Sequence, residues 1–297
     1  MRVMNEGAGV LAWSPAKLNL FLSIYGRRSD GFHELETLMV KVSLFDTLVF
    51  QPSGDATLSL RIRSMASEFA TIPTGPANLV LRAAELLRQR AGVDYGADIL
   101  LDKRIPAEAG LAGGSGNAAA TLVGLNRLWR LNFSRRELSS LAVRLGSDVP
   151  FFLSASNAAV ARGRGEKIEP VSVGGPLHFV LIKPPFGLPT AAVYSTFAEL
   201  GRFGNNRAGS LVADLAAGRL ARAARQLRND LMPAAEQLRP ELSTLRAHLE
   251  RECTHGGMMT GSGSACFGLC GSAREATRVA ARLRPRGFGR LLTASSA

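Results

Sequence analysis

Two long stretches near the start of the chain are rich in β-forming residues and alternate between apolar and polar positions. They cover residues 11–25 and 35–50, and a loop with two glycines, residues 26–34, lies between them. A period of two places successive side chains on opposite faces, as in a half-buried strand. We therefore expect two extended segments joined by a turn, and a further strand over residues 58–62.

The next part of the chain changes to helical spacing of its apolar residues. Asn78 is suited to cap a helix, and Gly92 is suited to end it in a left-handed conformation. Residues 97–106 then predict a strand that a proline stops, and residues 118–129 predict a second helix. Ser134, followed three residues later by a glutamate, has the spacing of a capping box and predicts a third helix.

The second half of the chain mixes both periods without a strict strand–helix alternation. The pattern predicts a turn-rich connector over 165–178, a buried strand over 178–185, helices within 190–252, a strand, glycine turn and strand over 256–270, a helix over 272–284 and a last strand over 288–294. Such a mixture indicates the α+β class rather than a doubly wound parallel sheet.

Composition narrows the class of protein. The chain has 297 residues, of which 46% are hydrophobic, so it can form one large domain or two of ordinary size. Three cysteines are too few for a disulfide framework and indicate a reducing compartment. No stretch approaches the roughly 20 apolar residues needed to cross a bilayer, and Glu6 interrupts the N-terminus where a signal peptide is apolar. We expect a cytoplasmic protein without a membrane partner.

The net charge of +12 has two interpretations. It is typical of a protein that binds nucleic acid or a polyanionic substrate, and it is also produced by a compositional bias toward arginine. The basic residues are scattered, and few aromatic residues accompany them, so stacking surfaces for single strands are scarce. This distribution favours bias first and an anionic substrate second, and it predicts no nucleic-acid partner.

The strongest chemical signal is a glycine-rich segment between the strand that ends near residue 106 and the helix that follows. Glycines allow consecutive backbone N–H groups to converge on an anion, and a helix N-terminus adds free amides and a positive dipole end. Ser115 is placed to contact a phosphate or a magnesium ion. A plain turn before a helix is the alternative interpretation. No Gly-Lys-Ser/Thr follows, and the protein-kinase motifs are absent, so the segment predicts a nucleotide site of another type.

Three further features could belong to the same site. A second glycine turn, residues 260–265, could close against the first segment or form a simple hairpin. Lys17 and Asn19 share one face of an apolar strand, where a lysine is costly unless it is paired or functional. Asp148, beside apolar residues, is either a turn or cap aspartate or a general base whose proton affinity a lysine sets.

These motifs resemble those of the GHMP small-molecule kinases. The glycine-rich segment resembles that family's ATP loop, residues 14–20 its N-terminal motif, and residues 260–265 its third motif. Four other segments resemble the branch that phosphorylates a cytidine diphosphate-linked polyol: residues 31–38, 146–151, 163–166 and 229–231. The resemblance implies a two-domain α/β sandwich, with domains at 1–165 and 166–297 and the active site in the cleft between them.

The resemblance also implies roles for particular residues, with ATP as co-substrate and Mg²⁺ bridging its phosphates. Asp148 would take the proton of the acceptor hydroxyl, and Lys17 would stabilise that carboxylate and the charge near the γ-phosphate. Asn78 and Lys103 would lie near the adenine. The ATP phosphates would be wrapped by Pro106, Ala107, Glu108, Ala109, Gly110, Leu111, Ala112, Gly113, Gly114, Ser115 and Gly116.

For the acceptor, the resemblance implies that His33 reads the cytosine edge while Phe32 and Tyr194 sandwich the ring. Asn19 and Thr190 would line the pocket for the polyol and its diphosphate. Three residues depart from the family pattern. Phe32 stands where tyrosine is common, Gly116 where a second serine is frequent, and Ala112 where glycine is usual, which puts a close backbone approach at that point in doubt.

Two other functions remain as alternatives. A sibling GHMP kinase acting on homoserine, mevalonate or a sugar would not need the Phe32-His33 pair as a base reader. A basic nucleic-acid-binding protein is a different class, which a steep salt dependence of RNA binding would identify. Cys266 and Cys270 have no further ligand partners at suitable spacing and are predicted to be buried thiols rather than a metal site.

Overall fold

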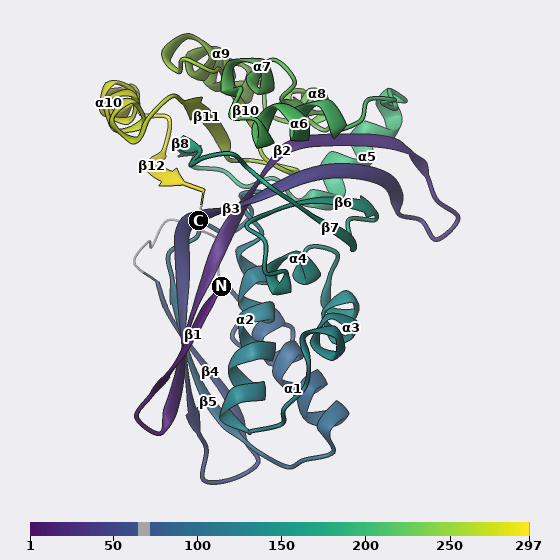
Figure 1. Cartoon of the computed structure of the whole chain (residues 1–297), viewed down its shortest axis with the longest axis vertical. Coiled ribbons are helices and arrows are strands. Elements are labelled where there is room, and N and C mark those ends of the chain that lie inside the picture. Colours follow the sequence, from purple (N-terminus) through teal and green to yellow (C-terminus); the bar gives the residue numbers. More distant parts are fainter. Residues whose placement is uncertain (65–71, 297) are drawn as a thin grey trace. The chain divides into compact units, whose positions relative to one another are not determined.

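The computed structural model describes residues 1–64 and 72–296, which form two compact units. Unit 1 consists of Met1–Ala16, Leu44–Ala107 and Ala112–Ala155, and unit 2 consists of Lys17–Ser43, Glu108–Leu111 and Ser156–Ala297. Strands β2 (Gly9–Arg27) and β3 (His33–Pro52) each contribute residues to both units (Figure 1). The two long extended segments expected from the alternating pattern are thus confirmed.

In unit 1, the strands form one continuous set of pairings. Strand β1 (Arg2–Glu6) pairs antiparallel with the first part of β2, and the last part of β3 pairs antiparallel with β5 (Ala97–Lys103). Strand β4 (Leu58–Ser64) pairs parallel with β5. Leu48 and Phe50, two residues apart on β3, are completely buried, which is the period-two pattern that predicted the strand.

Helices cover one face of the unit 1 strands, as Figure 1 shows: α1 (Leu79–Ala91), α2 (Gly113–Leu128), α3 (Arg135–Leu145) and α4 (Val149–Leu153). Helix α2 comes close to the sheet, because a Cβ at Gly124 would lie only 2.5 Å from the ring of Phe50. The caps expected at Asn78 and Ser134 are confirmed, since each side chain accepts a hydrogen bond from the first turn of its helix.

The start of α2 differs from the expectation. The sequence pattern predicts a helix from residue 118, whereas α2 begins at Gly113. Because glycines are poor helix formers, the glycine-rich residues 113–116 give no helical signal in the sequence. In the structure this turn is stabilised by tertiary contacts, with Gly113 against the side chain of Ile105 and Gly114 against Leu79. Residues 113–116 are therefore the first helical turn rather than part of a loop.

In unit 2, the first part of β3 pairs antiparallel with β6 (Ala158–Gly163), and β6 pairs antiparallel with β7 (Lys167–Val171). The connector expected over residues 165–178 was therefore only partly correct. Pro170 lies within β7 and weakened the strand signal in the sequence. The burial pattern of β7 and its pairing with β6 are those of an edge strand, where proline is tolerated. The short strand β9 (Arg228–Asn229) pairs parallel with β2.

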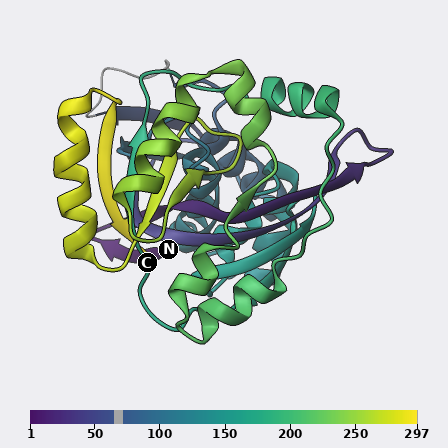
Figure 2. The same ribbon diagram turned by 90° about the horizontal axis from the view of Figure 1, so that it is seen from above.

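A second sheet in unit 2 has the order β10 (Gly257–Met259), β11 (Cys266–Cys270), β8 (His178–Lys183) and β12 (Arg290–Ser295), with each pair antiparallel. Helices α9 (Glu241–Glu252) and α10 (Ala273–Leu283) pack on it, and the 3-10 turn η1 (Arg284–Arg286) follows α10. Figure 2 shows α10, in yellow, lying along β12. The predicted strand–turn–strand and the final helix and strand are confirmed.

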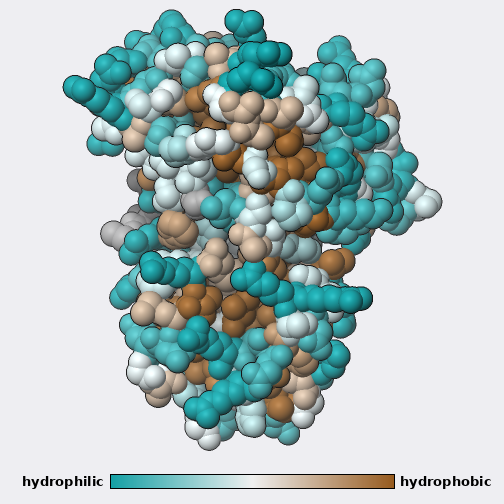
Figure 3. All heavy atoms as spheres, viewed as in Figure 1, coloured by the Kyte–Doolittle hydropathy of each residue, from teal (hydrophilic) through white to brown (hydrophobic). Residues whose placement is uncertain are grey.

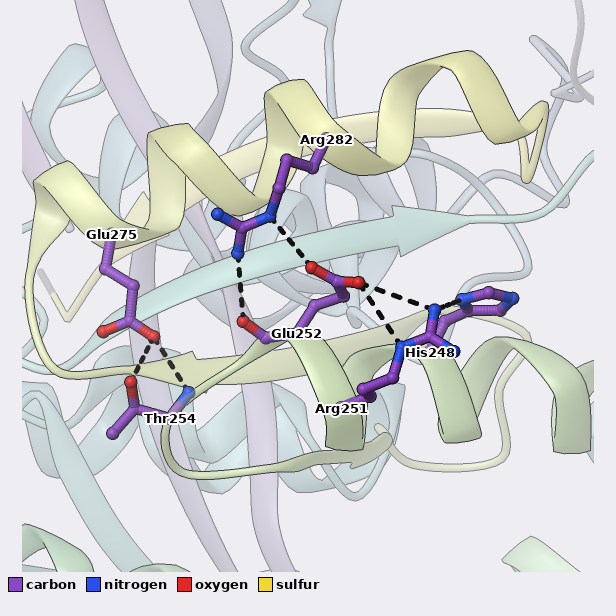
Figure 4. Close-up of polar contacts among 6 residues, drawn as sticks. All are labelled: His248, Arg251, Glu252, Thr254, Glu275 and Arg282. Atoms are coloured by element: carbon purple, nitrogen blue, oxygen red, sulfur yellow. Dashed lines mark hydrogen bonds and ion pairs between the residues drawn. The ribbon is translucent and has the colours of Figure 1, made fainter.

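Polar contacts connect the end of α9 with α10 (Figure 4). Glu275 accepts hydrogen bonds from the backbone N–H and the hydroxyl of Thr254, and Arg282 forms an ion pair with Glu252 at 2.9 Å. The same Glu275 carboxylate accepts from the backbone N–H of Gly271, and these bonds hold its pKa below the ordinary value although burial opposes the shift. These contacts thus connect the C-terminal end of α9 with both ends of α10.

The remaining helices of unit 2 are α5 (Thr190–Leu200), α6 (Gly209–Ala216), α7 (Leu220–Ala224) and α8 (Met232–Leu238). Hydrophilic side chains cover much of the face drawn in Figure 3, with smaller apolar areas between them. Within the part of the chain that the structure describes, no helix is both long and apolar enough to cross a membrane. The α+β class predicted from the sequence is confirmed.

Candidate active site

Lys17 and Asn19 lie on one face of β2 and are both buried, as the sequence predicts. The Lys17 ammonium donates hydrogen bonds to the Asn19 side-chain oxygen and, over 2.8 Å, to the carbonyl of Gly110. The amide nitrogen of Asn19 donates to the hydroxyl of Thr37, and its backbone N–H donates to the hydroxyl of Thr260. All of these residues belong to unit 2. The structure therefore brings Lys17 and Asn19 of the N-terminal motif together with Thr260 of the third motif.

The two glycine segments contact each other in unit 2. The backbone N–H of Ala265 donates to the carbonyl of Ala109 at 3.2 Å, and that of Ser264 donates to the carbonyl of Glu108. Gly110 has a φ of 70°, and a Cβ at this position would overlap the carbonyl oxygen of Thr260. The expectation that the second glycine turn could close against the first is confirmed, and only glycine fits at position 110.

His33 lies in a group of aromatic rings in unit 2. Its ring centroid is 5.1 Å from that of Tyr194 and 6.1 Å from that of Phe197. The Nε2 atom of His33 is buried and has no hydrogen-bond partner among the residues that the structure describes. Burial lowers the pKa of His33 below its ordinary value, and the positive charge of Arg27 acts in the same direction. The ring is therefore mainly neutral at pH 7, and its Nε2 is left without a hydrogen bond.

Phe32 and Thr190, two other predicted contacts of the acceptor, are near the surface of unit 2. Phe32 is 49% exposed, and the guanidinium of Arg164 lies 4.6 Å from its ring centroid. The hydroxyl of Thr190, at the start of α5, lies 2.9 Å from that of Ser262. Tyr194 lies next to His33, and the sandwich of Phe32 and Tyr194 around a base stays a prediction.

The second half of the ATP-loop segment lies in unit 1, where Gly113, Gly114, Ser115 and Gly116 form the first turn of α2. The first N–H groups of a helix have no partner within it, so this turn presents free donors to an anion. Ala112, just before the turn, has a left-handed φ of 53°, a conformation that glycine adopts at lower cost than alanine. Pro106 and Ala107 also lie in unit 1, at the start of the segment.

Gly116 faces the interior of unit 1. A Cβ at this position would lie 2.6 Å from the hydroxyl oxygen of Ser14 and 3.0 Å from the carbonyl oxygen of Pro15. A serine at position 116 would therefore meet the buried hydroxyl of Ser14, which itself has no hydrogen-bond partner among the described residues. This chain thus lacks the serine that is frequent at position 116, and the facing strand carries the hydroxyl of Ser14 at that point.

Asn78 and Lys103, both in unit 1, are occupied by contacts within the protein. The Asn78 oxygen accepts from the backbone N–H of Val80, and its amide nitrogen donates to the carbonyl of Pro73. The Lys103 ammonium forms a buried ion pair with Asp46 at 2.8 Å and donates to the carbonyl of Ile105. Their predicted position near the adenine of ATP stays a prediction.

Asp148 occupies the N-cap position of α4 in unit 1 and is half-buried, but its side chain makes no capping hydrogen bond to that helix. The cap interpretation of this aspartate therefore has no support in the described contacts. Lys17 belongs to unit 2, and the predicted Lys17–Asp148 pair stays a prediction.

Sequence reasoning missed some residues that organise the site. Asp46 is completely buried and holds Lys103, but in the sequence it is one acidic residue in a β-strand with no motif around it. Thr37 lies two and four residues after Leu35 and His33, so strand alternation would have placed it on the same face as His33. No group of three or more His, Cys, Asp or Glu side chains suited to a metal ion occurs among the residues described.

Comparison with known families identifies the class of protein. The sequence matches the GHMP kinases N terminal domain over residues 78–156 and the GHMP kinases C terminal domain over residues 211–288. The first match covers Asn78 to Asp148, and the second covers the 260–265 turn. A relative that aligns with 93% of this chain extends the match to nearly its whole length. The chain belongs to the GHMP kinase family.

Individual relatives share one particular activity in their names. A 4-diphosphocytidyl-2-C-methyl-D-erythritol kinase of Pelotomaculum thermopropionicum is 43% identical over 275 residues, which cover 93% of this chain and 94% of the relative. The enzyme of the same name from Rhodococcus jostii is 41% identical over 292 residues, or 97% of this chain and 92% of the relative.

Solved structures agree with this grouping. A crystal structure of 4-(cytidine 5'-diphospho)-2C-methyl-D-erythritol kinase has a TM-score of 0.80 at 37% identity, covering 96% of this chain and 98% of that one. A homoserine kinase from Cytophaga hutchinsonii has a TM-score of 0.75 at 18% identity, covering 100% and 97% of the two chains. The second likeness shows the fold alone.

Proposed function

We propose that this protein is an ATP-dependent kinase that phosphorylates the 2-hydroxyl of 4-diphosphocytidyl-2-C-methyl-D-erythritol, giving the 2-phosphate and ADP. The reaction belongs to the methylerythritol phosphate pathway of isoprenoid biosynthesis, and we expect the enzyme to act in the cytoplasm. The observation that carries the proposal is the buried, unpartnered Nε2 of His33 beside Tyr194. Relatives of 41–43% identity that bear this enzyme's name support it.

The His33 group has the chemistry required to read a cytosine. A buried polar atom without a partner is costly, so a ligand that supplies the hydrogen bond gains affinity and specificity. The neutral imidazole can donate from one nitrogen and accept at the other, which suits the mixed donor and acceptor edge of cytosine. Aromatic rings such as Tyr194 and the exposed Phe32 offer faces on which a base stacks. Homoserine, mevalonate and galactose would use none of these contacts.

The glycine-rich segment is suited to hold the ATP phosphates. The free N–H groups of Gly113, Gly114 and Ser115 lie at the positive end of α2, a helix of 16 residues, whereas the N–H of Gly116 already donates to the carbonyl of Ala112. The first half of the segment, at Gly110, accepts a hydrogen bond from Lys17. Asn19 and Thr190 then belong to the pocket for the methylerythritol and its diphosphate.

The chemical step transfers the γ-phosphoryl group to an alcohol. Asp148 accepts the proton of the 2-hydroxyl, the oxygen forms a bond to the γ-phosphorus, and the bond between that phosphorus and the β–γ bridging oxygen breaks to release ADP. Lys17 stabilises the charge that accumulates near the γ-phosphate. Most of the acceleration comes from positioning and electrostatics, because phosphoryl transfer requires little covalent chemistry of the protein.

Magnesium fits this scheme as an ion carried with ATP. Mg²⁺ usually keeps several waters and takes one or two protein ligands in addition to phosphate oxygens, so a dedicated carboxylate cluster is not required. Ser115, in the first turn of α2, would supply a hydroxyl ligand. The ion would neutralise charge on the phosphates during transfer.

The test is an assay of ADP release, coupled to an optical readout, with purified protein and MgATP. The acceptor 4-diphosphocytidyl-2-C-methyl-D-erythritol is compared with homoserine, mevalonate and galactose at equal concentrations. We expect turnover with the cytidine compound alone. Turnover with one of the other acceptors, or absence of turnover with all four, would refute the proposed substrate.

A further inference from the structure

Asp46 is a completely buried carboxylate in unit 1, on the part of β3 that pairs with β5. It accepts hydrogen bonds from two backbone N–H groups, those of Arg104 at 2.7 Å and Ile105 at 2.8 Å. It also accepts from the side-chain nitrogen of Asn117 at 2.9 Å and forms the ion pair with Lys103. Four donors thus converge on one carboxylate in the interior.

The two oxygens of Asp46 bind two different parts of the chain. Oδ1 accepts from the backbone of Arg104 and Ile105, directly before Pro106, where the glycine-rich segment begins. Oδ2 accepts from Asn117, the residue directly after Gly116, where that segment ends. One buried side chain therefore joins the entry and the exit of the segment.

Lys103 extends this connection to the start of α2. Its Nζ would lie 3.1 Å from a Cβ at Gly113, and the Cγ2 of Ile105 would lie 3.0 Å from the same point. Gly113 is the first residue of α2, whose free N–H groups face outward from the helix start. A shift of Lys103 or Ile105 would consequently displace the first turn of the helix.

The buried charge makes this arrangement sensitive to substitution. A buried ion pair stabilises a fold little compared with apolar residues, but removal of one partner leaves an unpaired charge that the structure must rearrange to accommodate. The groups affected first are residues 103–105, at the end of β5, and Asn117, because each is bonded directly to Asp46.

We propose that Asp46 is a positioning residue for ATP: it holds the two ends of the glycine-rich segment at the spacing that the nucleotide phosphates require. The inference rests on the proposed use of this segment as the ATP site. Asp46 is buried and does not touch the reacting atoms, so its effect on the reaction passes through the backbone of residues 103–105 and through Asn117.

The test is Asp46→Asn, which keeps the size of the side chain but places an amide donor against the donors of Asn117 or Lys103. The matched control is Asp102→Asn, which removes another strand carboxylate of unit 1 that is paired with Arg63 on the neighbouring strand. Binding of MgATP is measured by titration calorimetry without acceptor, and the KM values for ATP and for the cytidine acceptor are measured separately.

We expect Asp46→Asn to weaken MgATP binding and raise the KM for ATP about tenfold, with the acceptor KM changed less than twofold and Asp102→Asn near wild type. If Asp46 only stabilises the fold, the loss will be in the fraction of active protein, with both KM values unchanged. That result, or equal rises in both KM values, would overturn the proposal.

A second variant keeps the proposal testable if Asp46→Asn does not fold. Asn117→Ala removes one of the four donors and leaves the ion pair, and we expect it to weaken MgATP binding about threefold with the acceptor KM unchanged. Wild-type affinity for MgATP in this variant would contradict the proposal. Because MgATP binding is measured without acceptor, a wild-type protein that binds MgATP but phosphorylates none of the four acceptors would refute the proposed substrate and still test Asp46.

Discussion

The two groups of predicted site residues differ in how their polar atoms are used. In unit 1, Asn78 and Lys103 bond to the backbone and to Asp46, which leaves the N–H groups at the start of α2 as the donors available to an anion. In unit 2, His33 presents a side-chain nitrogen with no hydrogen-bond partner in the described part of the protein. For binding a ligand, unit 1 thus offers backbone N–H groups whose positions are fixed by side chains, whereas unit 2 offers a side-chain nitrogen.

This difference matches the two ligands of the proposed reaction. Phosphates are alike in all nucleotides, so a helix N-terminus and a loop backbone suffice to bind them. A base must be distinguished from other bases, which requires an edge-specific hydrogen bond from a side chain such as His33. Substitutions in unit 1 should consequently affect ATP, and substitutions near His33 should affect the acceptor.

The largest expected effect is an exception to this division, because Asp148 is a unit 1 side chain for which we propose a chemical role. We expect Asp148→Asn to reduce kcat about a thousandfold, since the amide cannot accept the proton of the hydroxyl. Calorimetric titration should find MgATP affinity within twofold of wild type. The control is Asp94→Asn, an exposed aspartate of the same unit. Parallel losses of turnover and ATP affinity would identify Asp148 as a structural residue instead.

His33→Ala sharpens the comparison directly. Loss of the ring should raise the KM for the cytidine acceptor about 30-fold, which is the order expected for removal of a specific hydrogen bond and a stacking neighbour. Steady-state kinetics should give an unchanged KM for ATP. His178→Ala, which removes a half-buried histidine bonded to Ser295, is the matched control. An equal rise in both KM values would contradict the assignment of His33 to the base.

A smaller effect follows from the lowered pKa of His33. Burial, assisted by Arg27, disfavours the imidazolium, so the neutral ring that reads the base persists below the ordinary histidine pKa of about 6.5. The acceptor KM should stay constant from pH 8 down to pH 6.5 and rise only at more acidic pH, as the ring gains a proton. Arg27→Gln should move that rise to higher pH. A KM that changes around pH 7 in the wild type would refute this account.

Most of the fold and much of the site follow from local patterns in the sequence. Alternation identified β2 and β3, and capping residues placed α1 and α3, because these signals depend on neighbours along the chain. The first turn of α2 was missed because its glycines are stabilised by tertiary contacts with Ile105 and Leu79, which lie outside the helix. Asp46 was missed because its partners are distant in sequence: the residues that donate hydrogen bonds to it lie 58 to 71 residues away.

The smallest effect tests whether unit 1 acts through its backbone. Ala112 has a left-handed φ of 53°, a conformation that costs an alanine about 1 kcal/mol more than a glycine. Ala112→Gly should therefore stabilise the protein by up to about 1 kcal/mol in urea unfolding, less the larger entropy that glycine loses on folding. Ala118→Gly, in the buried interior of α2, should destabilise it by about 1 kcal/mol.

The Ala112→Gly variant also tests whether the backbone conformation of the glycine-rich segment controls the affinity for MgATP. Ala112→Gly leaves the backbone path of the segment unchanged, so MgATP affinity should remain within twofold of wild type, in contrast to the loss expected for Asp46→Asn. A large loss of affinity in Ala112→Gly would show that the stiffness of the alanine, and not the anchoring by Asp46, keeps the segment in its binding conformation. Backbone geometry would then be set within the segment itself rather than by the buried carboxylate beneath it.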